Sequence, residues 1–225
     1  MEVVFLMDRF GYARTIDLTA YERNKEAADT ENKYVFPCKN TGRICLFTNT
    51  GQLHTLKVSD IPFGKFRDKG IPVDNISNFS GEKEAIIAAA SQTSLNLYRM
   101  IFVTKQAMMK IVDGGEFDVT KRTVAATKLS EEDEVISVEI LDDQKQVVLQ
   151  SAEGYFLKFN VEEIPEKKKN AIGVRGMRFT GKDFVENVYY TRITGEQMIS
   201  YRDKQVSLSK LKTAKRDGKG TKIRV

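Results

Sequence analysis

The sequence contains few of the residues that usually carry catalysis or bind metals. Among its 225 residues are two cysteines, one histidine, four prolines and no tryptophan. Cys38, Cys45 and His54 are too few for a four-ligand zinc site, and two cysteines do not make a disulfide scaffold. We therefore interpret both cysteines as small core residues on neighbouring strands, and we expect no metal site.

Sequence motifs of enzymes are missing as well. The sequence has no Gly-x-Ser-x-Gly element and no glycine-rich phosphate loop of the Walker type, so no nucleophile-base pair stands out. The acidic run SEEDE at 130–134 lacks the spaced ligands and the glycine of a calcium loop, and we interpret it as a solvated turn. These absences disfavour an independent hydrolase. We expect no catalytic residue and no cofactor in this domain.

Long apolar runs are absent too. No stretch approaches the length of a membrane-spanning helix, and the N-terminus lacks the pattern of a secretory signal, so we expect a cytoplasmic protein. Hydrophobic residues make up 41% of the chain, which is enough to build a sizeable core.

Charge is present and unevenly distributed. The net charge is +5, but residues 165–225 hold 16 Lys and Arg against 6 Asp and Glu, whereas residues 1–164 hold 20 against 25. Such asymmetry indicates a surface for a polyanion in the C-terminal part.

Five short segments share a hairpin pattern. VVFLMDRFGYARTID, ICLFTNTGQLHTLKV and VVLQSAEGYFLKFNV align without gaps on Gly11, Gly51 and Gly154, and two weaker copies place Ala107 and Lys204 at that position. Glycine adopts the positive φ of a tight turn, so each segment predicts a β-hairpin. A period of about 50 residues is typical of propeller blades. We predict one all-β domain over 1–225, a propeller-like disc of about five four-stranded blades.

A basic loop follows each hairpin after the first. Lysine and arginine recur there beside glycine, which lets a backbone approach a phosphate closely while the cations attract it. Cations at one blade position would form a discontinuous basic rim that bends a duplex without reading its sequence. The predicted DNA-binding residues are Arg67, Lys69, Lys121, Arg122, Lys167, Lys168, Lys169, Arg175, Arg178, Lys215, Arg216, Lys219 and Lys222.

The repeats also resemble a known family. FGYARTIDLTAYER, ICLFTNTGQLHTLKVSDIP, GKFRDKGIPVDNI, AIGVRGMRF and GKGTKIRV are similar to stretches of the C-terminal β-pinwheel of the A subunit of bacterial type IIA topoisomerases, gyrase and topoisomerase IV. The resemblance covers essentially the whole chain. It implies a β-pinwheel fold and binding of duplex DNA.

One departure favours topoisomerase IV over gyrase. Gyrase A subunits carry a box resembling QRRGGRG after the first hairpin, and residues 21–30 here read YERNKEAADT, with Arg23 and Lys25 against Glu22, Glu26 and Asp29. We expect residues 21–32 to form an exposed loop or a single helical turn, because they lack an apolar stripe. GVRGMRF in the fourth repeat retains part of the box pattern, so a gyrase wrapping domain stays open.

The resemblance also implies partners outside this chain. The DNA-cleaving tyrosine of the family lies in an N-terminal catalytic domain of the same polypeptide, and the ATPase belongs to the B subunit. ATP and Mg are thus expected in the holoenzyme only, and the isolated domain is expected to be non-catalytic. A propeller that docks proteins is the alternative from another class, and it requires an exposed apolar patch.

Overall fold

The computed structural model describes residues 1–192 and 195–224. It contains two compact units, the first formed by Met1–Leu97 with Gly114–Ala126 and the second by Tyr98–Asp113 with Thr127–Val225. The expectation of one domain over 1–225 stays a prediction.

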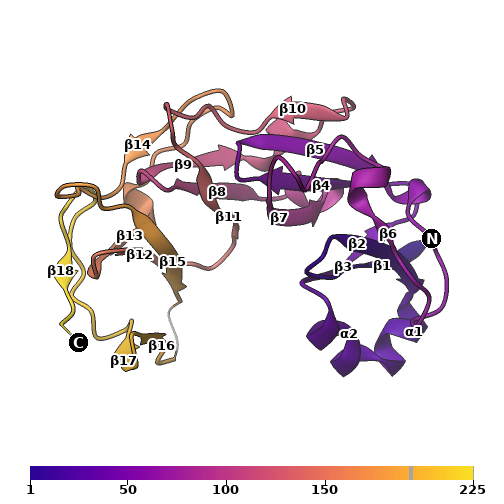
Figure 1. Ribbon diagram of the computed structural model, residues 1–225, viewed down its shortest axis with the longest axis horizontal. Coiled ribbons are helices and arrows are strands. Elements are labelled where there is room, and N and C mark those ends of the chain that lie inside the picture. The colour runs from indigo at the N-terminus through magenta and orange to yellow at the C-terminus, as the bar shows by residue number, and fades with distance from the viewer. Residues whose placement is uncertain (193–194, 225) are drawn as a thin grey trace. The chain divides into compact units, whose positions relative to one another are not determined.

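The first unit holds two four-stranded antiparallel sheets (Figure 1). The first sheet has the order β3-β1-β2-β6 and consists of β1 (Glu2–Met7), β2 (Tyr12–Asp17), β3 (Tyr34–Lys39) and β6 (Ile71–Pro72). The second sheet has the order β10-β5-β4-β7 and consists of β4 (Arg43–Thr48), β5 (Gln52–Lys57), β7 (Ile86–Ser91) and β10 (Thr123–Ala125).

The second unit repeats this architecture. The third sheet has the order β11-β8-β9-β14 and consists of β8 (Arg99–Thr104), β9 (Met108–Asp113), β11 (Val135–Leu141) and β14 (Val174–Arg175). The fourth has the order β15-β12-β13-β18 and consists of β12 (Gln146–Ser151), β13 (Tyr155–Asn160), β15 (Val185–Thr191) and β18 (Thr221–Lys222). The fifth is the hairpin of β16 (Met198–Tyr201) and β17 (Lys204–Ser207).

The all-β prediction is confirmed, with four-stranded sheets in the first four repeats. In the fifth repeat, the part of the chain that the structure describes forms two strands. Positive φ angles mark the hairpin turns at Gly11, Gly51, Gly154 and Ala107, as the alignment predicts. In the fifth hairpin the prediction is wrong by one residue, because the positive φ angles fall on the pair before Lys204, which itself begins β17.

Short strands are exchanged between consecutive sheets. Each segment that follows a hairpin pairs with the sheet of the preceding repeat: β6 with β2, β10 with β5, β14 with β9 and β18 with β13. We call these four the exchanged strands. The chain therefore returns after η3 (Gly114–Phe117) to complete a sheet of the first unit. Exchange places every predicted basic loop at the outer edge of a sheet.

The segment after the first hairpin differs. It forms α1 (Leu18–Arg23) and α2 (Lys25–Glu31), so the expectation of a loop or single helical turn is wrong. Asp17 caps α1 by accepting a hydrogen bond from the Ala20 backbone N–H. Ala28 is fully buried in a cluster with Val4, Leu6 and other residues of the first sheet. Ala20, Tyr21 and Ala27 pack against the same cluster and are only partly buried. Three of these four side chains are alanines, so the apolar stripe is weak among the charged residues and was missed in the sequence.

The remaining helices are short. They are α3 (Gln92–Leu95) and the 3₁₀ turns η1 (Val58–Asp60), η2 (Val73–Asn75) and η4 (Val161–Glu163). No helix in the described residues is long and apolar enough to cross a membrane.

The core lies between the inner strands of the sheets within each unit. In β4 and β12 five of the six positions are buried, since packed sheets cover both faces of these strands. Cys38 on β3 and Cys45 on β4 are both buried free thiols, which confirms the interpretation of the cysteines as core residues. Burial raises the pKa of the Cys38 thiol to about 11 and that of Cys45 to about 12, so neither is reactive.

Candidate nucleic-acid interface

The predicted DNA-binding residues all lie on or beside the exchanged strands. Their side chains are exposed, except for Lys169 and Arg216, which are partly buried. Arg67 and Lys69 precede β6, and Lys121 and Arg122 precede β10. Arg175 and Lys222 lie on β14 and β18, and the remaining members precede or follow these two strands. The recurrence seen in the sequence therefore corresponds to one repeated position in the fold, although contact with DNA stays a prediction.

Three of these loops are positioned by a close contact between their backbone and the receiving strand. The residue before each of β6, β14 and β18 is a glycine, and an added Cβ would lie 2.6, 2.3 or 2.6 Å from a carbonyl oxygen of the receiving strand, for Gly70, Gly173 and Gly220 in turn. A side chain does not fit at such distances. The glycines of the basic loops thus serve the strand exchange, and the prediction that they expose N–H groups to phosphate stays untested.

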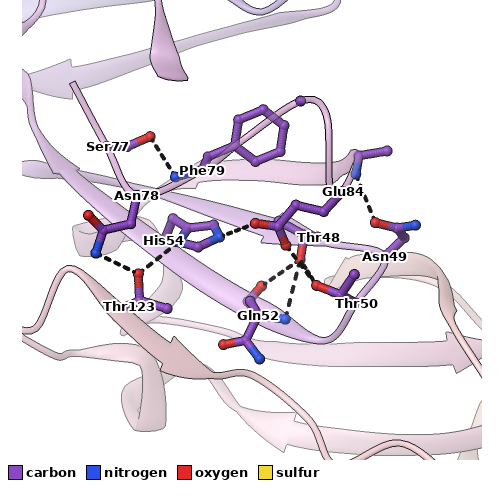
Figure 2. A network of polar contacts seen from close by, with 12 residues as sticks. Thr48, Asn49, Thr50, Gln52, His54, Ser77, Asn78, Phe79, Glu84 and Thr123 are labelled. Atoms are coloured by element: carbon purple, nitrogen blue, oxygen red, sulfur yellow. Dashed lines mark hydrogen bonds and ion pairs between the residues drawn. The ribbon is translucent and has the colours of Figure 1, made fainter. Parts of the chain in front are cut away.

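In the second sheet the aligned position is Thr123, which pairs with His54 in β5. Figure 2 shows the His54 ring between two partners: Nδ1 lies 2.8 Å from Thr123 Oγ1 and Nε2 lies 2.5 Å from Glu84 Oε2. Thr50 donates to the other carboxylate oxygen of Glu84 (2.7 Å), and Asn78 donates to Thr123 Oγ1 (3.0 Å). A carboxylate only accepts, so Nε2 of His54 carries a proton, and in the neutral ring Nδ1 accepts from the Thr123 hydroxyl.

This network is built into the sheet. The side chains of His54 and Glu84 are 4% and 9% exposed. Burial would raise the pKa of Glu84, but hydrogen bonds from Thr48, Thr50 and His54 outweigh it and hold that pKa below its usual value. A hydroxyl, an imidazole and a carboxylate in line have the composition of a hydrolytic triad. Here, however, the three groups are hydrogen-bonded to one another inside the sheet. We interpret this network as the contacts that hold β10 against β5.

In the third sheet a buried lysine holds the basic loop. Lys110 on β9 is 1% exposed, and its ammonium donates to the carbonyl oxygens of Lys168 (3.0 Å), Lys169 (2.9 Å) and Ala171 (2.7 Å). The backbone at 168–171 thus turns around one ammonium, which directs three of its carbonyls inward. An ammonium has three donors and can serve several carbonyls at once.

Lys158 does the same in the fourth sheet. This lysine on β13 is 5% exposed and donates to the carbonyls of Leu208 (3.0 Å), Ser209 (3.3 Å) and Leu211 (3.2 Å), which precede the last basic loop. Burial lowers the pKa of its ammonium.

The loops around β14 and β18 also contact each other. Arg175 forms a bidentate pair with Asp217, with Nε–Oδ1 at 2.6 Å and Nη2–Oδ2 at 3.2 Å. Arg178 Nε donates to the Asp217 carbonyl (2.7 Å). Arg216 donates to the carbonyls of Glu163 (2.9 Å) and Arg175 (2.8 Å). The structure therefore brings three predicted arginines together around one carboxylate, and the hydrogen bond from Arg175 holds the pKa of Asp217 below its usual value.

In the first unit the basic loops are held mainly through their backbone, and their cationic side chains make few contacts. Arg67 lies over the Phe66 ring, 4.9 Å from its centroid, and its guanidinium is 3.6 Å from Glu31 in an exposed ion pair. Thr55 fixes the second loop, since its N–H and hydroxyl donate to the carbonyls of Arg122 (2.9 Å) and Lys121 (2.8 Å). The cationic side chains of this unit extend into solvent.

The residues that position the loops were not predicted from the sequence. These are His54, Lys110, Lys158 and Asp217. The sequence did carry a signal for Lys110 and Lys158, which stand alone inside the apolar strands MMKIV and FLKFN. A lysine in such a strand is rarely buried without partners, so partners could have been expected. The acidic run at 130–134 forms a turn as predicted, and the described residues contain no cluster of three potential metal ligands among His, Cys, Asp and Glu.

Comparison with known families gives a match over most of the chain. The family described as "DNA gyrase C-terminal domain, beta-propeller" matches residues 42–92, 99–142, 145–192 and 204–224. The chain is 27% identical to the DNA gyrase A subunit of Helicobacter pylori over 97% of its length, and 28% identical to that of Lawsonia intracellularis over 82%. It spans 28% and 24% of these two relatives, about a quarter of their length.

Solved structures share the fold. The C-terminal domain of DNA topoisomerase IV superposes with a TM-score of 0.86 at 22% identity, covering 99% of this chain and 72% of that one. The E. coli ParC C-terminal domain gives 0.78 at 16% identity, covering 99% and 94%. A DNA gyrase A C-terminal domain gives 0.64 at 16% identity, covering 98% and 76%. These likenesses confirm the predicted β-pinwheel.

Proposed function

Because the chain belongs to the DNA gyrase C-terminal domain family of β-propellers, we propose that it binds duplex DNA through the basic loops beside its exchanged strands. The observation that carries the proposal is the recurrence of exposed cations at the same edge position in four consecutive sheets. Such cations contact phosphates, so binding depends little on sequence and strongly on salt, and the duplex bends to reach successive loops.

We place this activity within a larger enzyme. The relatives are gyrase polypeptides about four times as long as this chain, and the solved neighbours are C-terminal domains. In the proposed assembly the domain presents DNA to an N-terminal catalytic domain of the same polypeptide, and a B subunit supplies ATP hydrolysis with Mg. The domain itself contributes binding and bending in the cytoplasm.

Within this family we favour topoisomerase IV, an enzyme that decatenates and relaxes DNA, over gyrase. The support is the segment after the first hairpin, which folds into α1 and α2 and carries more acids than cations. A negatively charged helical pair attracts phosphate poorly. Relaxed circular DNA, incubated with the domain and then treated with a nicking-closing enzyme, decides this. Few constrained supercoils are expected, and strong constraint would instead support a gyrase wrapping domain.

DNA binding is tested by fluorescence anisotropy with two duplexes of about 40 bp and unrelated sequence across a salt series. We expect equal affinities and a slope of log K against log salt of about −0.9 for each phosphate contact. Arg175→Gln with Arg178→Gln should weaken binding about tenfold and lower the slope by about two contacts. The matched control is Arg99→Gln with Arg192→Gln, two exposed arginines outside the exchanged strands that pair with Glu166 and Asp143. A shallow slope, or equal losses in both variants, would contradict the proposal.

A protein-docking surface is the second candidate, and exposed aromatic side chains at the first hairpin turn favour it. Phe10 is 70% and Tyr12 is 45% exposed, and Arg9 lies over the Phe10 ring. Asp8 fixes this turn by accepting from the backbone N–H groups of both aromatic residues. Docking as the main function predicts no mobility shift with duplex DNA, whereas the leading proposal predicts a clear one.

A further inference from the structure

Asp217 is an acid placed among the cations of a basic loop. Its backbone has φ of 69°, a left-handed conformation that Asp and Asn tolerate better than other side chains. Two contacts hold this backbone, because its N–H donates to the Gly176 carbonyl (2.8 Å) and its carbonyl accepts from Arg178 Nε. The carboxylate is therefore fixed by the fold rather than by a flexible side chain alone.

The carboxylate occupies the donor edge of the Arg175 guanidinium, the edge that would face a phosphate. Asp217 accepts from Nε and Nη2 of Arg175, the parallel pair of donors that forms fork-shaped contacts with carboxylates and phosphates alike. The pair is accessible, since the side chains of Arg175 and Asp217 are 55% and 37% exposed. A phosphate approaching Arg175 meets a like charge while the carboxylate stays in place.

We propose that Asp217 is an internal competitor for a DNA phosphate at Arg175, so that the duplex must displace its carboxylate to form the contact. The ligand site consists of Arg175 with Arg178 and Arg216 beside it. This inference rests on the proposed function, and it adds a site at which affinity is limited by the protein's own anion. The lower affinity for duplex DNA would favour its release after each cycle.

The variant Asp217→Asn tests the competitor. Asparagine keeps the size, the backbone contacts and the tolerance for positive φ, and it removes the charge. We expect duplex affinity to rise about fivefold at about 100 mM salt, as for the loss of one exposed ion pair. In an Arg175→Gln background the same substitution should add less than about twofold, because the guanidinium in competition is gone.

Asp68→Asn is the matched control. Asp68 follows Arg67 in the loop before β6, as Asp217 follows Arg216, but its Oδ2 accepts from the Lys65 backbone N–H (2.7 Å) instead of pairing with an arginine. The charge change is the same, and we expect less than about a twofold gain. Equal gains in the two variants, a persistent gain without Arg175, or weaker binding by Asp217→Asn would overturn the proposal.

A second ligand separates this inference from the proposed function. If the wild-type domain fails to bind duplex even at about 20 mM salt, DNA binding itself is refuted. Tripolyphosphate then tests the site alone through thermal unfolding. A larger rise of Tm with tripolyphosphate in Asp217→Asn than in wild type supports competition at Arg175, and equal rises overturn it.

Discussion

The second and third sheets hold their exchanged strands with different chemistry at the same place. His54 and Lys110 both lie three residues after the turn position of their hairpin, at Gly51 and Ala107. In the second sheet the side chain of Thr123 meets the imidazole. In the third sheet a glycine takes the aligned position, and backbone carbonyls meet the ammonium.

The comparison shows what strand exchange requires. An incoming strand brings polar groups against a buried strand, and each must find a partner. Where a glycine lets the backbone approach, the orphaned groups are carbonyls, and a donor with three N–H bonds satisfies them. Where a threonine keeps the backbone away, the orphaned group is a hydroxyl, and an imidazole anchored by Glu84 satisfies it. In these two sheets the anchoring position is therefore the same, whereas its residue type follows the loop that it faces.

The largest expected effect comes from Lys110→Met, which keeps the length of the side chain and removes its donors. Three carbonyls lose a shared partner, so we expect the free energy of unfolding to fall by about 3 kcal/mol in urea titrations. Hydrogen exchange at residues 167–171 should rise with it. Lys158→Met in the fourth sheet is the matched variant, with longer bonds and a smaller expected loss. No difference from wild type would mean that the loop holds itself without the ammonium.

The next test substitutes alanine at the aligned position of each sheet. Gly173→Ala places a Cβ 2.3 Å from the Met109 carbonyl at φ of 103°, and we expect a loss of about 2 kcal/mol. Thr123→Ala in the second sheet introduces no clash and removes one hydroxyl, with an expected loss of about 1 kcal/mol. Thermal and urea unfolding of both variants measures the ranking. A reversed order would show that close approach is not what fixes β14.

The hairpins could be predicted from sequence because they are local. A glycine between two apolar runs, as at Gly11, Gly51 and Gly154, specifies its turn through neighbouring residues alone, and the structure confirms these turns. The basic loops were also visible, since lysine and arginine recur around Gly70 and Gly173, which lie at the same distance from the turn glycines Gly51 and Gly154. Exposed positions can be recognised in a repeat when the same residue types recur there in successive copies.

Strand exchange and its anchors were not predictable in the same way. β6 and β14 are two-residue strands that pair with the sheet of the previous repeat, so no local period marks them. Lys110 reads as a break in an apolar strand until its three carbonyl partners, 58 to 61 residues away, are known. Asp217 likewise reads as an ordinary loop acid until Arg175 faces it, 42 residues distant.

Acid should weaken the second sheet through Glu84. The pKa of Glu84 is lowered in the folded state from 4.5, so its contribution to stability is complete above pH 4.5 and is lost as pH falls through the folded-state value. Glu84→Gln should cost about 1 kcal/mol near neutral pH, and wild type and variant should converge in acid. Urea unfolding across the acid range measures this. A constant gap at all pH values would show that the carboxylate acts only through packing.

The smallest expected effect lies at the exposed end of the same network. Asn78 donates to Thr123 Oγ1 over 3.0 Å at the surface, where water replaces a lost hydrogen bond. Asn78→Ala should therefore lower the free energy of unfolding by less than about 0.5 kcal/mol, well below the loss in Thr123→Ala. The two substitutions together should cost no more than Thr123→Ala alone, because both remove the same contact. If the losses of the double variant in urea unfolding are fully additive, Asn78 stabilises the fold through a partner other than Thr123. The contacts that hold β10 would then consist of His54 and Thr123 without Asn78.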